Sequence, residues 1–250
     1  MRTRHFAVTA TLLVACGVSL PARAQNAPSG SEPSPDRSLT GFAALDRPVG
    51  MAEGGVGVLT LPAAEVCVER STGCNKGDVS FAVEAWQLYR PRLRWAFGAG
   101  LLLGLIPTAT PPRQDQEPPG VERDHTRSYM TVEGMARYYP YVGERLELWA
   151  GLAGGLVIVS DRFTVSGDLD ERAYAGPRGV TIRTEGGSLG VALGFAYELT
   201  RRWAFVGNLR YSEWFLPEKP ATDPLGSEAS LTGRNAVFSL ALGVAYRVDL

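Results

Sequence analysis

Apolar residues alternate with polar or small residues in eight segments of this chain. The clearest segment carries Leu93, Trp95, Phe97, Ala99, Leu101, Leu103 and Leu105 on one face and Arg94, Ala96, Gly98, Gly100, Leu102 and Gly104 on the other. Successive side chains of a β-strand point to opposite faces, so this pattern predicts a strand between two different environments. The bulky face has too little small-residue space opposite it to be the core of a soluble barrel, and we interpret it as facing lipid.

The lengths of the connections predict the topology. The strands expected from the alternation span 52–61, 79–89, 93–105, 127–139, 145–159, 180–199, 203–215 and 235–250. The connections at 90–92, 142–144 and 200–202 are short, whereas those at 63–77, 107–126, 161–178 and 217–233 are long and rich in Pro, Gly, Ser and charge. Three short turns interleaved with four long loops predict an all-β fold, an eight-stranded antiparallel up-and-down transmembrane β-barrel with both termini at the short-turn end.

Aromatic residues gather near the predicted strand ends, as expected for two belts at membrane–water interfaces. One group lies near the short turns or the C-terminus: Tyr89, Tyr138, Tyr139, Tyr141, Tyr197, Trp203 and Tyr246. The other lies near the long loops: Tyr129, Tyr211, Trp214 and Phe215.

The first residues predict export. Arg2 and Arg4 precede an apolar stretch, and Pro21 is followed by the small-x-small cleavage motif Ala22-Arg23-Ala24, which indicates a signal peptide over 1–24. A competing interpretation is a lipoprotein processing box ending in Cys16. Residues 25–49 are then expected to form a flexible periplasmic leader and residues 50–250 the barrel domain.

Charge excludes one class of partner. The chain has 25 basic and 26 acidic residues, and removal of the signal peptide leaves 22 basic against 26 acidic. A chain with this acidic balance is not expected to bind nucleic acid.

The end of the last predicted strand carries a small-x-Gly-x-x-aromatic-x-apolar pattern with Gly243, Tyr246, Val248 and Leu250. It resembles the sorting signal that the barrel-assembly machinery reads, although outer-membrane barrels usually end in an aromatic residue. Residues 50–250 therefore resemble the small eight-stranded outer-membrane barrels of the OmpA/OmpX/OmpW type, without a peptidoglycan-binding domain. The resemblance implies a monomer in the outer membrane, in contact with its lipid and lipopolysaccharide.

Charged residues alternate onto the face predicted to line the barrel: Glu84, Arg94, Glu133, Arg137, Glu147, Glu198, Arg210 and Arg247. Eight strands enclose a space that side chains nearly fill, so we expect these charges to pair into a plug and not to line an aqueous pore.

Candidates for catalysis are few. His125, Ser128 and Glu133 invite comparison with lipid A deacylases of the outer membrane, which use Ser, His and Glu on a barrel wall. His125 and Ser128 are an odd number of positions apart, which places them on opposite faces of a strand. We therefore expect His125 to be a surface residue of a loop.

Two cysteines, Cys67 and Cys74, flank six residues of the first long connection. An exported chain meets oxidising conditions, so we expect a local disulfide. The segment offers too few further ligands for a metal site, and no cofactor is expected.

These observations favour a non-enzymatic outer-membrane barrel that serves envelope structure or binds a surface partner, of unknown identity, through its long loops. The alternatives are a narrow channel for small or apolar solutes and, less favoured, a lipid A-modifying enzyme.

Overall fold

The fold is a closed barrel of antiparallel strands. The computed structural model describes residues 48–69, 73–105, 108–110, 122–166, 179–222 and 228–250. Its strands are β1 (Val49–Glu69), β2 (Gly73–Arg92), β3 (Trp95–Gly104), β4 (Thr108–Thr110), β5 (Glu122–Val142), β6 (Leu146–Ser166), β7 (Gly179–Glu198), β8 (Trp203–Phe215) and β9 (Arg234–Asp249). No helix in the described part of the chain is long and apolar enough to cross a membrane.

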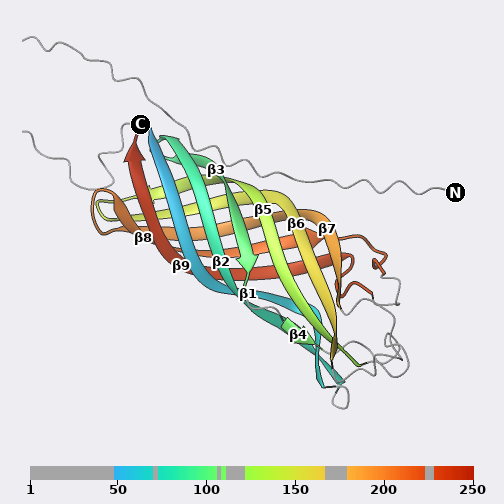
Figure 1. Ribbon diagram of the computed structural model, residues 1–250. Coiled ribbons are helices and arrows are strands. Elements are labelled where there is room, and N and C mark those ends of the chain that lie inside the picture. Colours follow the sequence, from blue (N-terminus) through green and yellow to red (C-terminus); the bar gives the residue numbers. More distant parts are fainter. Residues whose placement is uncertain (1–47, 70–72, 106–107, 111–121, 167–178, 223–227) are drawn as a thin grey trace, which may run out of the picture. The chain divides into compact units, whose positions relative to one another are not determined.

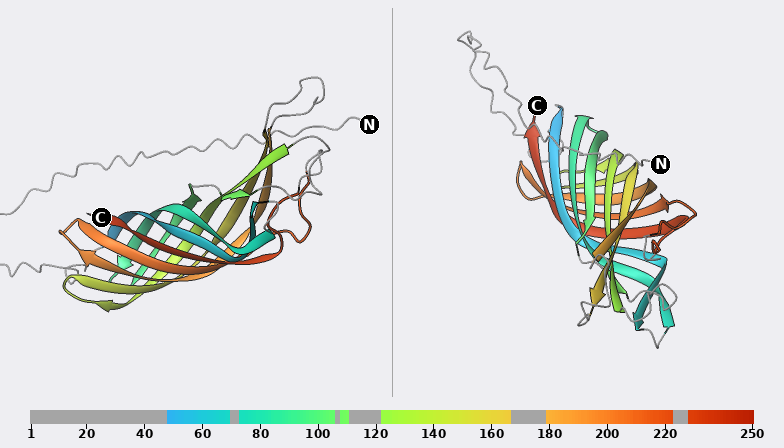
Figure 2. Two further views of the ribbon diagram at one scale, coloured as in Figure 1. Left: turned by 90° about the horizontal axis from the view of Figure 1, so that it is seen from below. Right: turned by 45° about the vertical axis from the view of Figure 1, so that its right-hand side comes forward.

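Two pairings close the ring. The first strand pairs with the last, from Val49 opposite Asp249 to Thr60 opposite Phe238, and β3 pairs with β5. The short strand β4 follows β3 along the same edge of β5, so β3 and β4 together occupy one place in the wall. The ring therefore has eight positions, and the predicted eight-stranded antiparallel barrel is confirmed (Figures 1 and 2).

The two faces of the barrel wall differ as the alternation predicts. Leucines, valines and aromatic residues cover the outside, and many of them are exposed, such as Leu152, Leu156 and Leu193 at 60–66%. Charged and small residues turn inward together with aromatic rings and aliphatic side chains such as Leu59, Leu88 and Val157. A water-soluble barrel would have a polar outer face in place of this apolar one.

Two inward glycines make room for tryptophan rings in the interior. A Cβ at Gly100 would lie 2.2 Å from the ring of Trp86, and a Cβ at Gly194 would lie 2.3 Å from the ring of Trp149. Both rings belong to one buried cluster with Met51, Leu88 and Tyr139. The small residues of one strand thus accommodate the large residues of its neighbour, as close packing of a narrow interior requires.

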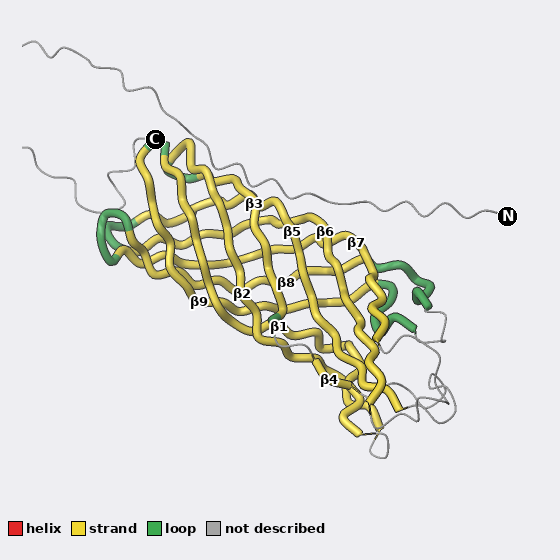
Figure 3. Tube along the Cα trace, viewed as in Figure 1, coloured by secondary structure: helices red, strands yellow, loops and turns green. Residues whose placement is uncertain are grey.

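The strands are longer than predicted at the long-loop end. The hairpin β1–β2 covers most of the expected loop 63–77, and β5 and β6 extend a few residues into the expected loops 107–126 and 161–178 (Figure 3). Polar composition suggested loops there, but an antiparallel ladder is held by backbone hydrogen bonds, which polar side chains do not prevent. The described residues 217–222 and 228–233 belong to none of these strands.

Three aromatic residues expected in the interfacial belts point inward instead. Tyr129, Tyr139 and Trp214 are buried, with Tyr129 and Trp214 in contact at a ring distance of 5.5 Å. Proximity to a strand end does not decide on which face a side chain lies, whereas its phase in the alternation does. Tyr89, Tyr141, Tyr197, Trp203 and Phe215 do lie on the outside.

The predicted signal peptide, Cys16 and nearly all of the leader lie outside the described residues. The strand β1 begins at Val49, the last residue assigned to that leader.

Candidate functional site

The interior near the short turns is organised around one carboxylate. Glu147 on β6 is fully buried, with Oε1 2.8 Å from Arg90 Nη1 and Oε2 3.0 Å from Arg247 Nη2. The guanidinium of Arg90 also lies 4.0 Å from the ring centre of Tyr139. One anion therefore balances two cations from β2 and β9, which stand on either side of β1 in the ring.

Further charged groups of the interior have their own partners. Arg137 on β5 forms a bidentate pair with Glu53 on β1, both contacts at 2.8 Å, and lies 3.9 Å from the centre of the Trp149 ring. Arg210 Nη1 on β8 lies 2.6 Å from Glu133 Oε2, and Ser188 donates a hydrogen bond to Glu133 Oε1.

Three of the predicted interior charges differ from the expected pairing. Glu84 accepts a hydrogen bond from Asn208. Arg94 is exposed and donates to the hydroxyl of Tyr138 at 3.1 Å, so it does not belong to the interior at all. Glu198, at the end of β7, is partly exposed and has no ion pair in the described part of the chain.

Two partners in the interior, Arg90 and Glu53, were not predicted from the sequence. Arg90 belongs to an Arg-Pro-Arg segment that was predicted to be a short turn. Glu53 lies in a glycine-rich stretch whose two faces differ little in polarity. A signal was nevertheless present, because Arg90 continues the inward phase of Glu84, Trp86 and Leu88.

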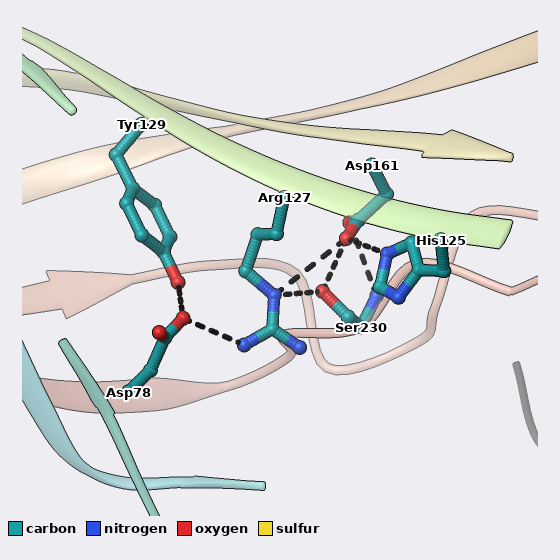
Figure 4. Close-up of polar contacts among 6 residues, drawn as sticks. All are labelled: Asp78, His125, Arg127, Tyr129, Asp161 and Ser230. Carbon is teal, nitrogen blue, oxygen red and sulfur yellow. Dashed lines mark hydrogen bonds and ion pairs between the residues drawn. The ribbon is translucent and has the colours of Figure 1, made fainter. Parts of the chain in front are cut away.

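A second polar cluster lies at the long-loop end of the barrel. Figure 4 shows the contacts among its side chains. His125 Nε2 lies 2.7 Å from Asp161 Oδ1, and its ring stacks on Phe163 at a centre distance of 4.5 Å. Ser230 donates to the same carboxylate through its hydroxyl, and through its amide at 3.1 Å. Arg127 Nε donates to Ser230 Oγ at 2.7 Å. His125 is therefore a buried strand residue, and its expected place on an exposed loop is wrong.

The cluster also includes a residue of a third strand, β2. Arg127 Nη1 donates to Asp78 Oδ2 at 3.1 Å, and the hydroxyl of Tyr129 donates to the same oxygen. Asp78 comes from β2, whereas Arg127 and Tyr129 come from β5, and Asp161 from β6. Ser230 belongs to the connection between β8 and β9, which lies across the ring from β5 and β6.

Residues 228–231 of this connection, which we name the strap, therefore reach across the mouth of the barrel. Leu231 is buried in one apolar cluster with Leu59, Tyr129 and Trp214, and Ala229 is buried in another with Phe163 and Ile182. The strap is held at its middle by polar bonds and on both sides by apolar contacts.

The environment of Asp161 favours its charged form. Burial alone would raise the pKa of this carboxyl, but the hydrogen bonds from His125 and Ser230 outweigh burial and hold the pKa below its ordinary value. A group with a lowered pKa in the folded state stabilises that state above its ordinary pKa, about 3.9 for aspartate, and loses this contribution as the pH falls through the lowered value. Asp161 therefore stays charged at neutral pH and keeps its hydrogen bonds to the strap.

The cluster does not form a nucleophilic triad. The Ser230 hydroxyl donates to the aspartate and accepts from the arginine, so its proton is directed at Asp161 and not at His125. Ser128, the serine considered with His125 and Glu133, lies on the outward face of β5, while both of the others are buried on the inward face. Among the described residues, no three His, Cys, Asp or Glu side chains lie close enough together to hold a metal ion.

The remaining predicted residues lie in the strands near the two ends. Cys67 on β1 stands directly opposite Cys74 on β2 in the backbone register, and their disulfide stays a prediction. In the predicted assembly signal, Tyr246 packs against Trp203 at a ring distance of 4.9 Å, while Val248 and Leu250 are exposed. Gly243 faces Gly54 so closely that a Cβ would lie 2.0 Å from its carbonyl oxygen.

Asp161→Asn should loosen the strap without opening the wall. The asparagine side chain would keep the size of the aspartate but lose the charged acceptor of three groups, at an expected cost of about 1–3 kcal/mol. Amide hydrogen exchange of Ala229, Ser230 and Leu231 should become faster, while exchange in the β1–β9 ladder stays unchanged. Thr232→Ala, at an exposed position of the same connection, is the matched control. Unchanged protection of the strap in the Asp161 variant would show that the apolar contacts alone hold it.

The chain resembles several solved structures, each at low sequence identity. No protein-family model matches the chain, and a search of curated proteins found no significant match. Solved structures do resemble it: the attachment invasion locus protein Ail of Yersinia pestis has 12% identity and a TM-score of 0.44, covering 82% of this chain and 100% of Ail. The outer membrane protein OprG of Pseudomonas aeruginosa has 12% identity and a TM-score of 0.42, covering 85% of this chain and 99% of its own. The outer membrane protease OmpT of Escherichia coli has 12% identity and a TM-score of 0.38, covering 82% and 98%.

Proposed function

We propose that this chain is an integral outer-membrane barrel with a closed, non-conducting interior, and that it acts in envelope structure or in surface interaction through its long-loop end. The observation that carries the proposal is the inverted distribution of side chains. Apolar residues cover the outside, and the charged residues are kept inside in pairs, among aromatic and aliphatic side chains. Only hydrocarbon around the wall makes that distribution favourable.

Two obstructions support the proposal of a closed interior. The ion pairs of Glu147, Arg137 and Glu133 occupy the interior together with the rings of Trp86 and Trp149. At the long-loop end, the strap reaches across the mouth. A barrel of eight strands has an interior just wide enough for such side chains, so little room is left for a path of water.

The remaining properties belong to the same proposal. Exposed Val248 and Leu250 beside Tyr246 would be read by the barrel-assembly machinery, the apolar outer surface would contact lipid, and the chain would act as a monomer without enzymatic activity. Signal-peptide cleavage after Ala24 and the disulfide between Cys67 and Cys74 are also part of it.

Fractionation and conductance together test the proposal. The mature protein should be recovered with outer membranes and should migrate faster on a gel before heating than after it. The same folded preparation should give no stable unitary currents in a planar bilayer. Arg210→Ala with Glu133→Ala removes one ion pair from the interior and should raise the frequency of currents, whereas Arg201→Ala with Arg202→Ala, in an exposed short turn, should not. Stable unitary currents from the unchanged protein would favour the channel alternative, and recovery in the soluble fraction would refute the membrane location.

A further inference from the structure

Two arginines stand on the outward face of the wall just beyond its apolar band. Arg162 on β6 and Arg183 on β7 are both exposed. Arg162 pairs in register with Thr181, and Arg183 with Ser160, so the two arginines are diagonal neighbours on one face. Such neighbours are about 7–8 Å apart, within reach of long side chains that converge on one ligand.

Hydroxyl groups surround both arginines. Thr126 on β5 pairs with Arg162, and Ser128 pairs with Ser160. Residues that pair across β5, β6 and β7 form rows along the wall. Two adjacent rows therefore carry two guanidinium groups among four hydroxyls. We name this surface the arginine–hydroxyl patch; it consists of Thr126, Ser128, Ser160, Arg162, Thr181 and Arg183.

The arginines of this patch are available for a ligand. Within the described ranges, neither Arg162 nor Arg183 has an ion pair or a side-chain hydrogen bond. The arginines of the barrel interior, by contrast, are each paired with a carboxylate. Two acidic residues share the outward face, Glu185 in the row below the patch and Asp124 in the row above it. Their charges would repel an anion and so confine it to the two rows between them.

The position of the patch indicates what kind of anion it meets. The rows below it carry Met130 and Ile158, and then Val132 and Leu156, of which Leu156 is 66% exposed. Val132 and Leu156 belong to the band that faces hydrocarbon, and the row of Ile158 and Glu185 lies at its edge, so the patch stands at the depth of lipid headgroups on the long-loop side. Guanidinium groups bind phosphate through paired hydrogen bonds, and hydroxyls suit the sugars beside it.

We propose that the arginine–hydroxyl patch binds a phosphate group of the phosphorylated glycolipid of the outer leaflet, the lipid A portion of lipopolysaccharide. This inference rests on the proposed function, because it requires the long-loop end to face the outer leaflet. The bound lipid would fix the depth of β5, β6 and β7 in the membrane and would lie directly outside the wall that anchors the strap.

The test compares two lipids in a constant background. Folded protein is placed in phosphatidylcholine nanodiscs that contain lipid A with both phosphates, or the same lipid A without phosphate, and bound lipid A is counted by native mass spectrometry. The unchanged protein should bind the phosphorylated form roughly tenfold more tightly, as expected for charge-assisted bonds to two arginines. Arg162→Gln with Arg183→Gln should lose this preference, and Arg201→Gln with Arg202→Gln, at the opposite end, should retain it. Arg162→Lys with Arg183→Lys should give an intermediate value, since lysine keeps the charge but not the paired geometry.

Three outcomes would overturn the inference. They are equal affinity of the unchanged protein for the two lipids, an unchanged preference in the Gln double variant, and displacement of lipid A by millimolar inorganic phosphate, which would indicate a simple anion site. Heat-modifiable migration of every variant shows that it is folded. If the unchanged protein does not insert into the nanodisc, the proposed membrane location fails; if it inserts without preference, only the lipid site fails.

Discussion

Leu193→Arg should largely prevent assembly of the barrel, whereas Leu199→Arg should assemble almost normally. Leu193 lies in the middle of the outward face of β7 and is 60% exposed, and Leu199 follows the same strand at the short-turn end and is 58% exposed. An arginine on the lipid face costs about 2–4 kcal/mol at the bilayer midplane and about 0–1 kcal/mol near an interface. The two substitutions are therefore chemically identical and differ only in depth.

The measurement is the folded fraction after refolding into lipid vesicles, read from heat-modifiable migration and followed by a urea titration. Ala204→Ser, at a buried position on the inward face of β8, controls for substitutions that do not meet lipid. Equal folded fractions for Leu193→Arg and Leu199→Arg would mean that the apolar band does not contact hydrocarbon.

Glu147→Gln should destabilise the barrel more than the loss of any exposed charge. The substitution leaves Arg90 and Arg247 buried with like charges and without the carboxylate that now pairs with both. Removing one partner of a buried ion pair costs about 3–5 kcal/mol, because the remaining charge is desolvated and unbalanced. Glu144→Gln, three residues earlier in an exposed turn, should have little effect.

A compensating variant separates the loss of charge from the loss of shape. Glu147→Gln combined with Arg247→Gln removes one surplus cation and should recover part of the lost stability, as measured by urea unfolding in vesicles. If the double variant is destabilised by the sum of the two single effects, then these residues do not interact energetically and the interior is held by its apolar contacts.

The inward phase of the strands could be read from the sequence, and so could the number of strands. Leu93 to Leu105 and Phe238 to Val248 each have one apolar and one small or polar face, because a strand presents alternate residues to opposite sides whatever its neighbours are. The extents of the hairpins could not be read in the same way. Beyond the apolar band the outward face of β5 and β6 is polar, and the inward face mixes charged residues such as Asp161 with apolar ones such as Phe163, so composition no longer distinguishes a strand from a loop.

The positions of individual charged residues could likewise be predicted only in part from the sequence. Arg137 and Glu147 were placed inside by their phase, but Arg94 was placed there as well and is exposed near a short turn, where the wall ends and solvent reaches the side chain. His125 was expected on a loop because polar residues surround it, although its phase agrees with that of Thr131 and Glu133 on the inward face.

The sequence by itself determined the class of fold, because the direction of each side chain along a strand is a local property with a period of two residues. The tertiary structure alone decided which charges meet. The partners Arg90 and Glu147 are 57 residues apart, Arg137 and Glu53 are 84 apart, and Ser230 and Asp161 are 69 apart. Closure of the ring and the register of its strands bring such residues together. Both depend on backbone hydrogen bonds along whole strands, and the side chains specify them only as a set, not one by one.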